Sequence, residues 1–269
     1  MTYKRKEVIG ECTLLLGDCR DILPTLGKVS HVITDPPYDK DAHAAGHRVL
    51  SIVGTKRRDT IAAPLSFEPM TDGCMETIAS YCAANCDGWA LAFCQVEMVG
   101  KWRGFFEAAG ARWARGMVWV KPDSSPQLSG DRPAQGFESI ALAWCGKGRS
   151  EWNGGGRRGV FVMSKHDPGM GHGGAKNEHE TQKPVKLMSE LVELFSNPDD
   201  LVLDPFVGSG TTGIACIKLG RRFIGIEADE KWFNLACRRI EAAYAQPDFF
   251  VEAAKAEKPV QLDLMAGDA

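Results

Sequence analysis

The sequence predicts an α/β protein built on a doubly wound, mostly parallel sheet. Short apolar runs alternate along the chain with segments of helical spacing, which is the pattern of parallel strands joined by crossover helices. Four of these runs lead directly into an acidic residue. Because the carboxyl ends of parallel strands share one edge of a sheet, where ligands bind, we expect the four acids to lie together at that edge.

Each element rests on a local pattern. The runs expected as strands are 12–17, 29–34, 89–93, 116–120, 139–144, 201–203 and 222–226, with a brief strand at 160–163. The four acids are Asp18, Asp35, Asp204 and Glu227. A helix is expected over 184–195, which has a proline near its first turn and apolar residues at helical spacing. Asp229 is a good N-cap for a second helix that carries Trp232, Ala236 and Ile240.

Composition limits the class of protein. A hydrophobic fraction of 44% and a charged fraction of 25% are those of a globular protein, which excludes disordered and fibrous classes. There is no apolar run of about 18 residues and no h-region after the charged start, so we expect a cytoplasmic protein that does not bind membranes. The nine cysteines form no zinc-like spacing, so reduced thiols and no metal are expected. We expect one catalytic domain, 1–246, and a short tail, 247–269.

Charge is sorted along the chain although the net charge is only -3. Residues 101–186 hold 14 Lys and Arg against 8 Asp and Glu, whereas the rest of the chain holds 18 against 27. A basic middle between acidic ends is typical of a phosphate-facing surface on a body that binds a small molecule. Chance clustering on a solvated surface gives the same balance, so charge alone does not decide between the two.

A strand, an acid and a glycine turn occur together in the run LDPFVGSGTT, residues 203–212. Gly208 and Gly210 allow the backbone to approach a ligand, and the helix that follows offers free N–H groups. No lysine follows the glycines, which disfavours a nucleoside triphosphate. Glu227 ends the next strand, where its carboxylate could accept hydrogen bonds from both ribose hydroxyls. The pattern favours an adenosyl ligand without a pyrophosphate, with a ligand-free tight turn as the alternative.

The run Thr34-Asp-Pro-Pro-Tyr38 directly follows a predicted strand. Two prolines fix φ and remove two donors, so the Asp35 carboxylate and the Pro36 carbonyl are two acceptors in one rigid place. Tyr38 adds a flat aromatic face beside them. This arrangement suits an aromatic amine, whose –NH2 group binds the acceptors while its ring stacks. A proline-stiffened strand end with a surface tyrosine is the alternative for these residues taken alone.

Three motifs together resemble the DNA amino-methyltransferase family, in particular its circularly permuted beta group. They are Asp35-Pro-Pro-Tyr38, His179-Glu-Thr-Gln-Lys-Pro184 and Asp204-Pro-Phe-Val-Gly-Ser-Gly210. The beta group places its DPPY motif before the cofactor motif, as this sequence does. The resemblance spans roughly 12–243 and implies the fold of S-adenosylmethionine-dependent methyltransferases. One departure is Glu180, where the family often has proline.

The resemblance implies a reaction and a site. A methyl group would pass from S-adenosylmethionine to N6 of adenine in double-stranded DNA, directly and after base flipping. The target base would be held by Asp35, Pro36, Pro37 and Tyr38. The cofactor would contact Asp18, Cys19, Asp35, Thr181, Lys183, Asp204, Phe206, Gly208, Ser209, Gly210, Thr211, Thr212 and Glu227. Among these, Asp18 would meet adenine, Glu227 the ribose, and Thr181 and Lys183 the carboxylate end.

DNA recognition is expected mainly in an inserted, basic and glycine-rich segment, 121–178, with help from 39–64. The second stretch lacks periodicity, so we expect a loop on the substrate side. Candidate contacts to phosphates or guanine edges are Arg48, Lys56, Arg57, Arg58, Arg132, Arg149, Arg157 and Arg158. Relatives in the beta group are often dimeric, which implies a homodimer, and the family also implies a place in restriction–modification or epigenetic regulation.

Several alternatives stay open at this point. N4 of cytosine fits the same acceptors, although in this family DPPY favours adenine and SPPY favours cytosine. An RNA or a protein-glutamine methyltransferase is disfavoured, since the latter group has an NPPY motif and orders its motifs the other way. A catalytically silent DNA-binding regulator is disfavoured by the intact acceptors and glycines. Phe93-Cys-Gln95 lacks the proline of a cytosine carbon-5 nucleophile and lies in an apolar run, so Cys94 is expected to be a buried structural thiol.

Overall fold

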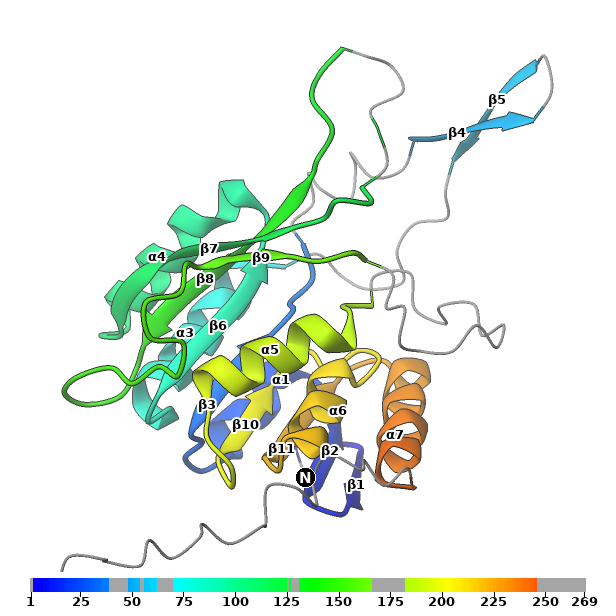
Figure 1. The fold of residues 1–269 in the computed structure, drawn as a ribbon. Helices are drawn as coiled ribbons and strands as arrows, with labels where there is room; N and C mark the ends of the chain where they lie inside the picture. Colours follow the sequence, from blue (N-terminus) through cyan, green and yellow to red (C-terminus); the bar gives the residue numbers. More distant parts are fainter. Residues whose placement is uncertain are drawn as a thin grey trace, which may run out of the picture.

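A nine-stranded sheet with helices on both faces forms the body of the protein (Figure 1). The computed structural model describes residues 2–38, 48–53, 56–61, 70–124, 126, 131–165 and 182–245. The sheet order is β1-β2-β11-β10-β3-β6-β8-β7-β9. The run from β2 to β6 pairs in parallel, and antiparallel pairs join β1 to β2, β6 to β8 and β8 to β7. The predicted doubly wound, mostly parallel sheet is confirmed.

All eight expected strands are present, with ends that differ by a few residues. The strands of the main sheet are β1 Arg5–Ile9, β2 Cys12–Leu16, β3 His31–Thr34, β6 Trp89–Cys94, β7 Arg112–Val120, β8 Phe137–Trp144, β9 Val160–Val162, β10 Leu201–Asp204 and β11 Arg222–Glu227. The helices are α1 Cys19–Ile22, η1 Leu23–Thr25, α3 Asp72–Asn85, η2 Val96–Met98, α4 Val99–Ala108, α5 Val185–Phe195, α6 Thr211–Lys218 and α7 Glu230–Ala245. The two helices predicted from the sequence are α5 and α7.

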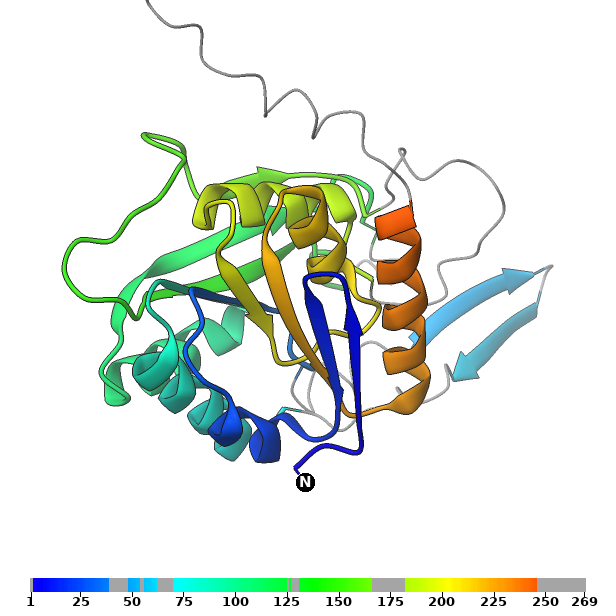
Figure 2. The same cartoon turned by 90° about the horizontal axis from the view of Figure 1, so that it is seen from below.

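Helices cover both faces of the sheet (Figure 2), and an apolar core lies on each face. One core packs α5, α6 and α7 against the sheet, and the other packs α1, α3 and α4. The central strands β3 and β6 are buried along their whole length, because both of their faces are covered. Within the described residues, no helix is long and apolar enough to cross a membrane.

The stretch 39–64, expected to be a loop, contains a hairpin. Strand β4 Arg48–Val53 pairs antiparallel with β5 Lys56–Ile61, in a register that sets Val53 against Lys56. The hairpin projects away from the main sheet (Figure 1). Only two residues, Gly54 and Thr55, separate the strands in the sequence, a spacing typical of a tight hairpin. The expectation of an irregular loop is therefore wrong for these strands, while His43 and His47 lie outside the described residues.

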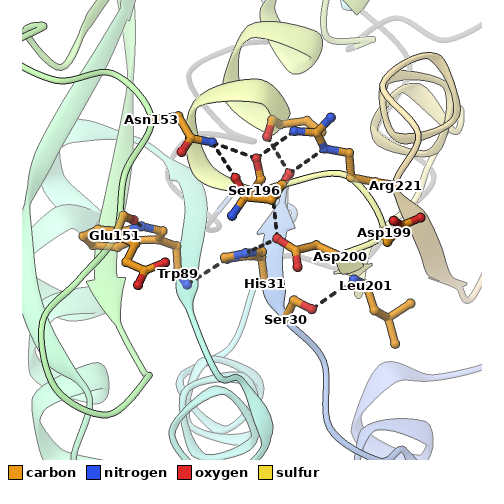
Figure 3. A network of polar contacts seen from close by, with 12 residues as sticks. Ser30, His31, Trp89, Glu151, Asn153, Ser196, Asp199, Asp200, Leu201 and Arg221 are labelled. Atoms are coloured by element: carbon orange, nitrogen blue, oxygen red, sulfur yellow. Dashed lines mark hydrogen bonds and ion pairs between the residues drawn. The ribbon is translucent and has the colours of Figure 1, made fainter. Parts of the chain in front are cut away.

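A polar network ties strands together at the amino edge of the parallel sheet, opposite the four acids (Figure 3). The Trp89 N–H donates to His31 Nδ1 at 3.0 Å, so the His31 Nε2–H faces Asp200 Oδ2, also at 3.0 Å. Nearby, Arg221 Nε and Asn153 Nδ2 donate to the hydroxyl and carbonyl oxygens of Ser196, at 3.1 Å and 2.9 Å. A cavity of about 210 Å³ lies beside this network.

Candidate active site

The four acids at strand ends meet at one edge of the sheet, as expected. Strands β2, β11, β10 and β3 are consecutive neighbours in the sheet and run parallel. Asp204 and Glu227 are the last residues of β10 and β11, and Asp35 directly follows β3. Asp18 lies two residues beyond β2. This carboxyl edge is where the sequence predicts a ligand.

Asp204 holds three segments of this edge together. Its side chain is 2% exposed. One oxygen, Oδ1, accepts from Thr34 Oγ1 at 2.7 Å and from the Phe206 N–H at 3.0 Å, while Oδ2 accepts from Thr212 Oγ1 at 2.7 Å. Burial raises the pKa of Asp204 to about 6, although these three hydrogen bonds oppose the rise. The carboxylate thus joins the end of β3, the glycine turn and α6.

The glycine turn has the backbone that its sequence predicts. Gly208 and Gly210 have φ of +50° and +82°, in the left-handed region. The turn leads into α6, whose first residue is Thr211. Gly213 completes a G-x-G-x-x-G spacing, and a Cβ there would lie 2.9 Å from Phe223 Cε1 and 2.8 Å from Ile240 Cδ1. The third glycine therefore permits close packing of α6 on β11 and α7.

Glu227 holds the same turn from the neighbouring strand. Its Oε2 accepts from the Gly208 N–H at 2.9 Å, and its Oε1 accepts from the Asp229 N–H at 3.0 Å. Burial raises the pKa of Glu227, and these backbone donors oppose the rise. Ser209 and Thr211 are buried beside it, with their hydroxyl oxygens 3.2 Å apart. The structure thus brings the predicted cofactor residues of 204–212 together with Glu227.

Asp18 and Cys19 lie at the same edge in local roles. Asp18 is the N-cap of α1, where its Oδ1 accepts from the Arg20 N–H at 2.8 Å, and it also pairs with the Arg20 guanidinium. This pairing lowers the pKa of Asp18. The Cys19 thiol is buried, 3.9 Å from the thiol of Cys74. Contact of Asp18 with a cofactor adenine stays a prediction.

Asp35 is part of a nearly buried network of alternating charges. Its Oδ2 lies 2.5 Å from Lys183 Nζ, which also lies 3.1 Å from Glu138 Oε2. The other oxygen of Glu138, Oε1, accepts from Lys121 Nζ at 2.8 Å. The Lys183 ammonium lies 5.0 Å from the centre of the Phe93 ring. Asp35 Oδ1 is buried and has no hydrogen-bond partner among the residues that the structure describes.

The charged groups in this network shift one another's pKa values. Burial raises the pKa of Asp35, and the Lys183 ammonium opposes that rise. Burial also acts to raise the pKa of Glu138, but the ammonium groups of Lys183 and Lys121 outweigh it and lower this pKa to about 2. Of the two carboxyl groups, Glu138 is therefore the one that stays ionised. Asp35 is the member whose charge depends most on its neighbours.

Glu138 and Lys121 were missed by sequence reasoning, although a signal existed. Lys121 directly follows one predicted strand and Glu138 directly precedes the next. An antiparallel pairing of those strands places the two residues together, and in the structure Val120 pairs with Phe137. Lys183 is expected near the carboxylate end of a cofactor, and that contact stays a prediction. In the structure the Lys183 ammonium contacts Asp35 and Glu138. Thr181 lies outside the described residues.

The candidate DNA contacts are spread over different parts of the molecule. Arg132 is exposed in the connection from β7 to β8, which starts at Lys121 and ends at Gly136. Lys121, at the start of this connection, and Glu138, just beyond its end, belong to the ion-pair network of Asp35. Arg48, Lys56, Arg57 and Arg58 lie on the β4–β5 hairpin. Arg149, Arg157 and Arg158 are exposed in the connection from β8 to β9, which begins at the amino edge, where the Cys145 N–H donates to the Gly88 carbonyl. The structure does not bring these last three together with Asp35, and Arg157 pairs with Glu190 on α5.

Curated relatives match this chain over different lengths. YubD of Escherichia coli (strain K12) is 28% identical over 233 residues, 84% of this chain and 88% of its own length. The type II methyltransferase M2.DpnII of Streptococcus pneumoniae and the DNA adenine methyltransferase YhdJ of Escherichia coli (strain K12) are each 48% identical over 65 residues. That segment is 24% of this chain and only 24% and 22% of those two relatives.

Solved structures and a family model agree on the fold. The structure of the M1.HpyAVI–SAM complex superposes with a TM-score of 0.64 at 27% identity, covering 85% of this chain and 98% of that one. The cytosine-N4-specific PvuII DNA methyltransferase gives 0.64 at 14% identity, covering 90% and 95%, and shows the fold alone. The N6_N4_Mtase model of DNA methylases matches residues 29–238, which include Asp35, Lys183, Asp204 and Glu227. The chain therefore belongs to the N6_N4_Mtase family of DNA methylases.

Proposed function

We propose that this chain is a DNA methyltransferase that uses S-adenosylmethionine to methylate N6 of adenine in double-stranded DNA. The observation that carries the proposal is the joining of the two motifs on neighbouring strands. Thr34, next to Asp35 at the end of β3, donates its hydroxyl to Asp204 at the end of β10, at 2.7 Å. An acceptor for an amine and a glycine turn for an adenosyl group therefore share one rigid edge.

The residues at this edge fit the cofactor. Two glycines with positive φ leave the turn without Cβ atoms, and α6 begins directly behind it with free N–H groups. When bound, S-adenosylmethionine supplies a methyl group whose bond to sulfur breaks, with its electron pair staying on sulfur, as the new bond to nitrogen forms. Glu227 keeps the turn in shape through Gly208 and stands at the end of the next strand, where we place the ribose.

The residues of the DPPY motif hold the acceptor amine. The buried oxygen Asp35 Oδ1, which lacks a partner among the described residues, accepts a hydrogen bond from the amino group. The Pro36 carbonyl accepts a second one, and the Tyr38 ring stacks on the base. One proton must leave the nitrogen when the methyl group is added, and the Asp35 carboxylate is the acceptor in place. The task of the protein is alignment and electrostatics, without a covalent intermediate.

The base assignment is tested by analysis of modified nucleosides. DNA methylated by the protein, digested and analysed by mass spectrometry, should contain N6-methyladenine. The DPPY motif and the name of YhdJ, a DNA adenine methyltransferase, support adenine. N4-methylcytosine would move the assignment to cytosine and leave methyl transfer intact. No modified base in any genomic DNA would favour a catalytically silent regulator.

We also propose a DNA-facing surface and an assembly. The carboxyl edge, the connection that holds Arg132 and the β4–β5 hairpin together form the DNA side, with 1–246 as the catalytic domain. Within the predicted recognition segment 121–178, we assign the connection from β7 to β8 to DNA, because β8 and β9 are strands of the main sheet. Residues 166–178 and the tail 247–269 lie outside the described residues. The homodimer, the permuted motif order of the beta group, the cytoplasmic location and a role in restriction–modification or epigenetic regulation stay predictions from the resemblance. Light scattering at micromolar concentration that gives a fully active monomer would refute the dimer.

A further inference from the structure

We propose that Glu138 is a positioning residue that acts on Asp35 through Lys183. Glu138, itself held by Lys121, keeps the Lys183 ammonium against Asp35 Oδ2, so that Oδ1 alone is left to receive the target amino group. The inference rests on the proposed function, because it assigns a task to residues outside the DPPY motif. Glu138 and Lys121 lie in none of the three motifs that resemble the family.

Three ion pairs in a row link Asp35 to Lys121. Asp35 Oδ2 meets Lys183 Nζ at 2.5 Å, Lys183 Nζ meets Glu138 Oε2 at 3.1 Å, and Glu138 Oε1 meets Lys121 Nζ at 2.8 Å. The Lys183, Lys121 and Glu138 side chains are 8%, 13% and 15% exposed. Each ion is flanked by opposite charges, which compensates for the loss of water around it. Removing one member leaves a charge without compensation in this nearly buried site.

The geometry also separates the two oxygens of Asp35. Oδ2 is taken by an ammonium that Glu138 holds from its other side, whereas Oδ1 has no partner among the described residues. The Lys183 ammonium is further placed by the Phe93 and Tyr38 rings, whose centres lie 5.0 Å and 5.9 Å away. A carboxylate fixed through one oxygen presents the other in a single direction, which is what alignment of an amine requires.

Two neighbours of Asp35 act on its charge in opposite directions. Lys183 stabilises the ionised form, whereas Glu138, by like charge, destabilises it. The remaining groups that face the site are Lys121, Tyr38 and, on β6 and β10, Cys94 and Asp204. Transfer needs the Asp35 carboxylate, so activity falls as the pH drops through the pKa of Asp35. Neutralising Lys183 should raise that pKa, and neutralising Glu138 should lower it.

The test compares Lys183→Met, Lys183→Arg, Glu138→Gln and Lys121→Met, with Lys28→Met as a control from an exposed ion pair at the opposite edge. For each, kcat and KM for DNA and cofactor are measured across a series of pH values. Lys183→Met should move the acidic limb of kcat to higher pH by about one unit, a tenfold loss on that limb. Lys121→Met should move it the same way by less. Glu138→Gln should move it to lower pH and reduce kcat on the plateau by about tenfold, because Lys183 loses its anchor. Lys183→Arg should restore most of the wild-type profile, and Lys28→Met should reproduce it.

A second readout does not depend on turnover. The Asp35 carboxyl carbon, labelled with ¹³C and followed by NMR, should titrate higher in Lys183→Met and lower in Glu138→Gln than in the wild type. Titrations and profiles that coincide with the wild type in folded variants would overturn the inference, as would shifts of both variants in one direction. If a Lys183 variant fails to fold, Lys121→Met and Glu138→Gln decide by the same criteria. Wild-type protein that methylates no DNA while the Asp35 titrations shift as expected would refute the proposed function and leave the network standing.

Discussion

Single residues at the carboxyl edge have separable tasks. In the proposed function Asp35 faces the acceptor amine, whereas Asp204 and Glu227 are engaged with the turn and α6. A change at Asp35 should therefore affect chemistry, and a change at Glu227 should affect cofactor binding. The sequence also separates Asp35, Asp204 and Glu227, because each of these acids ends or follows a different predicted strand.

Asp35→Asn tests this separation. The amide keeps the shape of the side chain but cannot accept a proton, so methyl transfer should fall by about 10² or more. Cofactor affinity, measured by calorimetric titration, should stay within a few-fold of the wild type. Glu227→Ala is the matched comparison, since the Gly208 and Asp229 N–H groups lose their acceptor and cofactor affinity should drop. Loss of cofactor binding in Asp35→Asn would show that Asp35 acts mainly in binding the cofactor.

At the opposite edge, His31 should make the stability of the protein depend on pH. Burial lowers the pKa of His31, and Asp200 opposes that effect only in part. The folded state therefore binds its proton less readily than the unfolded state, whose histidine has a pKa of about 6.5. The contribution of His31 to stability is present above that value and is lost as the pH falls below it.

The change His31→Asn isolates this contribution. The Asn carbonyl can still accept from the Trp89 N–H but does not titrate. The difference in unfolding free energy between wild type and variant, from urea denaturation, should be largest above neutral pH and shrink as the pH falls below about 6.5. A difference that is constant with pH would show that His31 does not titrate between the two states.

At the scale of elements, the turn before α6 depends on helix α7 behind it. A Cβ on Gly210 would lie 3.1 Å from the Ala236 Cα, and Gly210 has φ of +82°. The glycine is thus required twice, by its own backbone and by the packing of α7. A cofactor-binding defect in a Gly210 variant therefore includes a shift of α6 against α7.

Gly210→Ala and Gly220→Ala separate the two requirements. Gly220 also has a positive φ, of +70°, but beyond its chain neighbours no atom of the described residues lies within 4 Å of the Cβ position. Both variants should lose about 1–2 kcal/mol of unfolding free energy from the left-handed backbone. Gly210→Ala should lose more than Gly220→Ala and should alone weaken cofactor binding. Equal losses of unfolding free energy with unchanged cofactor affinity would show that neither the packing against α7 nor the cofactor requires Gly210.

The elements found from the sequence are those with a strong apolar pattern. Strands β3 and β6 are buried on both faces and read as continuous apolar runs, and α5 buries one clear stripe. Strand β1 was missed because its first three residues, Arg5, Lys6 and Glu7, are charged and leave no apolar run. Helix α3 was missed because its buried side is made partly of small residues, Cys and Ala, and so gives only a weak apolar pattern. In the β4–β5 hairpin, four of the six residues of β4 are apolar, but β5 is mostly charged and polar, so the sequence shows no second apolar run to pair with the first.

The candidate site, like the fold, was predictable from the sequence only in part. Asp35, Asp204 and Glu227 end or follow apolar strands, so topology alone brings them to one edge. The contact of Lys183 with Asp35 was not predictable, because it depends on how the segment before α5 crosses the sheet. Glu138 and Lys121 needed the pairing of β7 with β8, which is antiparallel and set by long-range packing.

At the scale of the whole molecule, the positions of the arginines predict which contacts DNA. Arg132→Ala, at the edge of Asp35, should weaken binding to all DNA sequences and lower the salt slope by about one unit if it contacts a phosphate. Loss of about 1–3 kcal/mol at one base position would instead mark a base contact. Arg149→Ala, in the connection that begins at the amino edge, should leave affinity and slope unchanged. A smaller salt slope in Arg149→Ala would place DNA at the amino edge instead.

The sheet order also has a consequence for how the protein is made. Strand β2 pairs with β11, and β3 pairs with β10, so early strands wait for partners from much later in the chain. While only β2 and β3 have left the ribosome, the edges that β11 and β10 will later cover carry free backbone groups. Such distant pairings close slowly and expose the nascent chain to aggregation. Folding of this centre should therefore be largely post-translational, and chains that stop before β10 should be cleared by proteases rather than persist as partly active fragments.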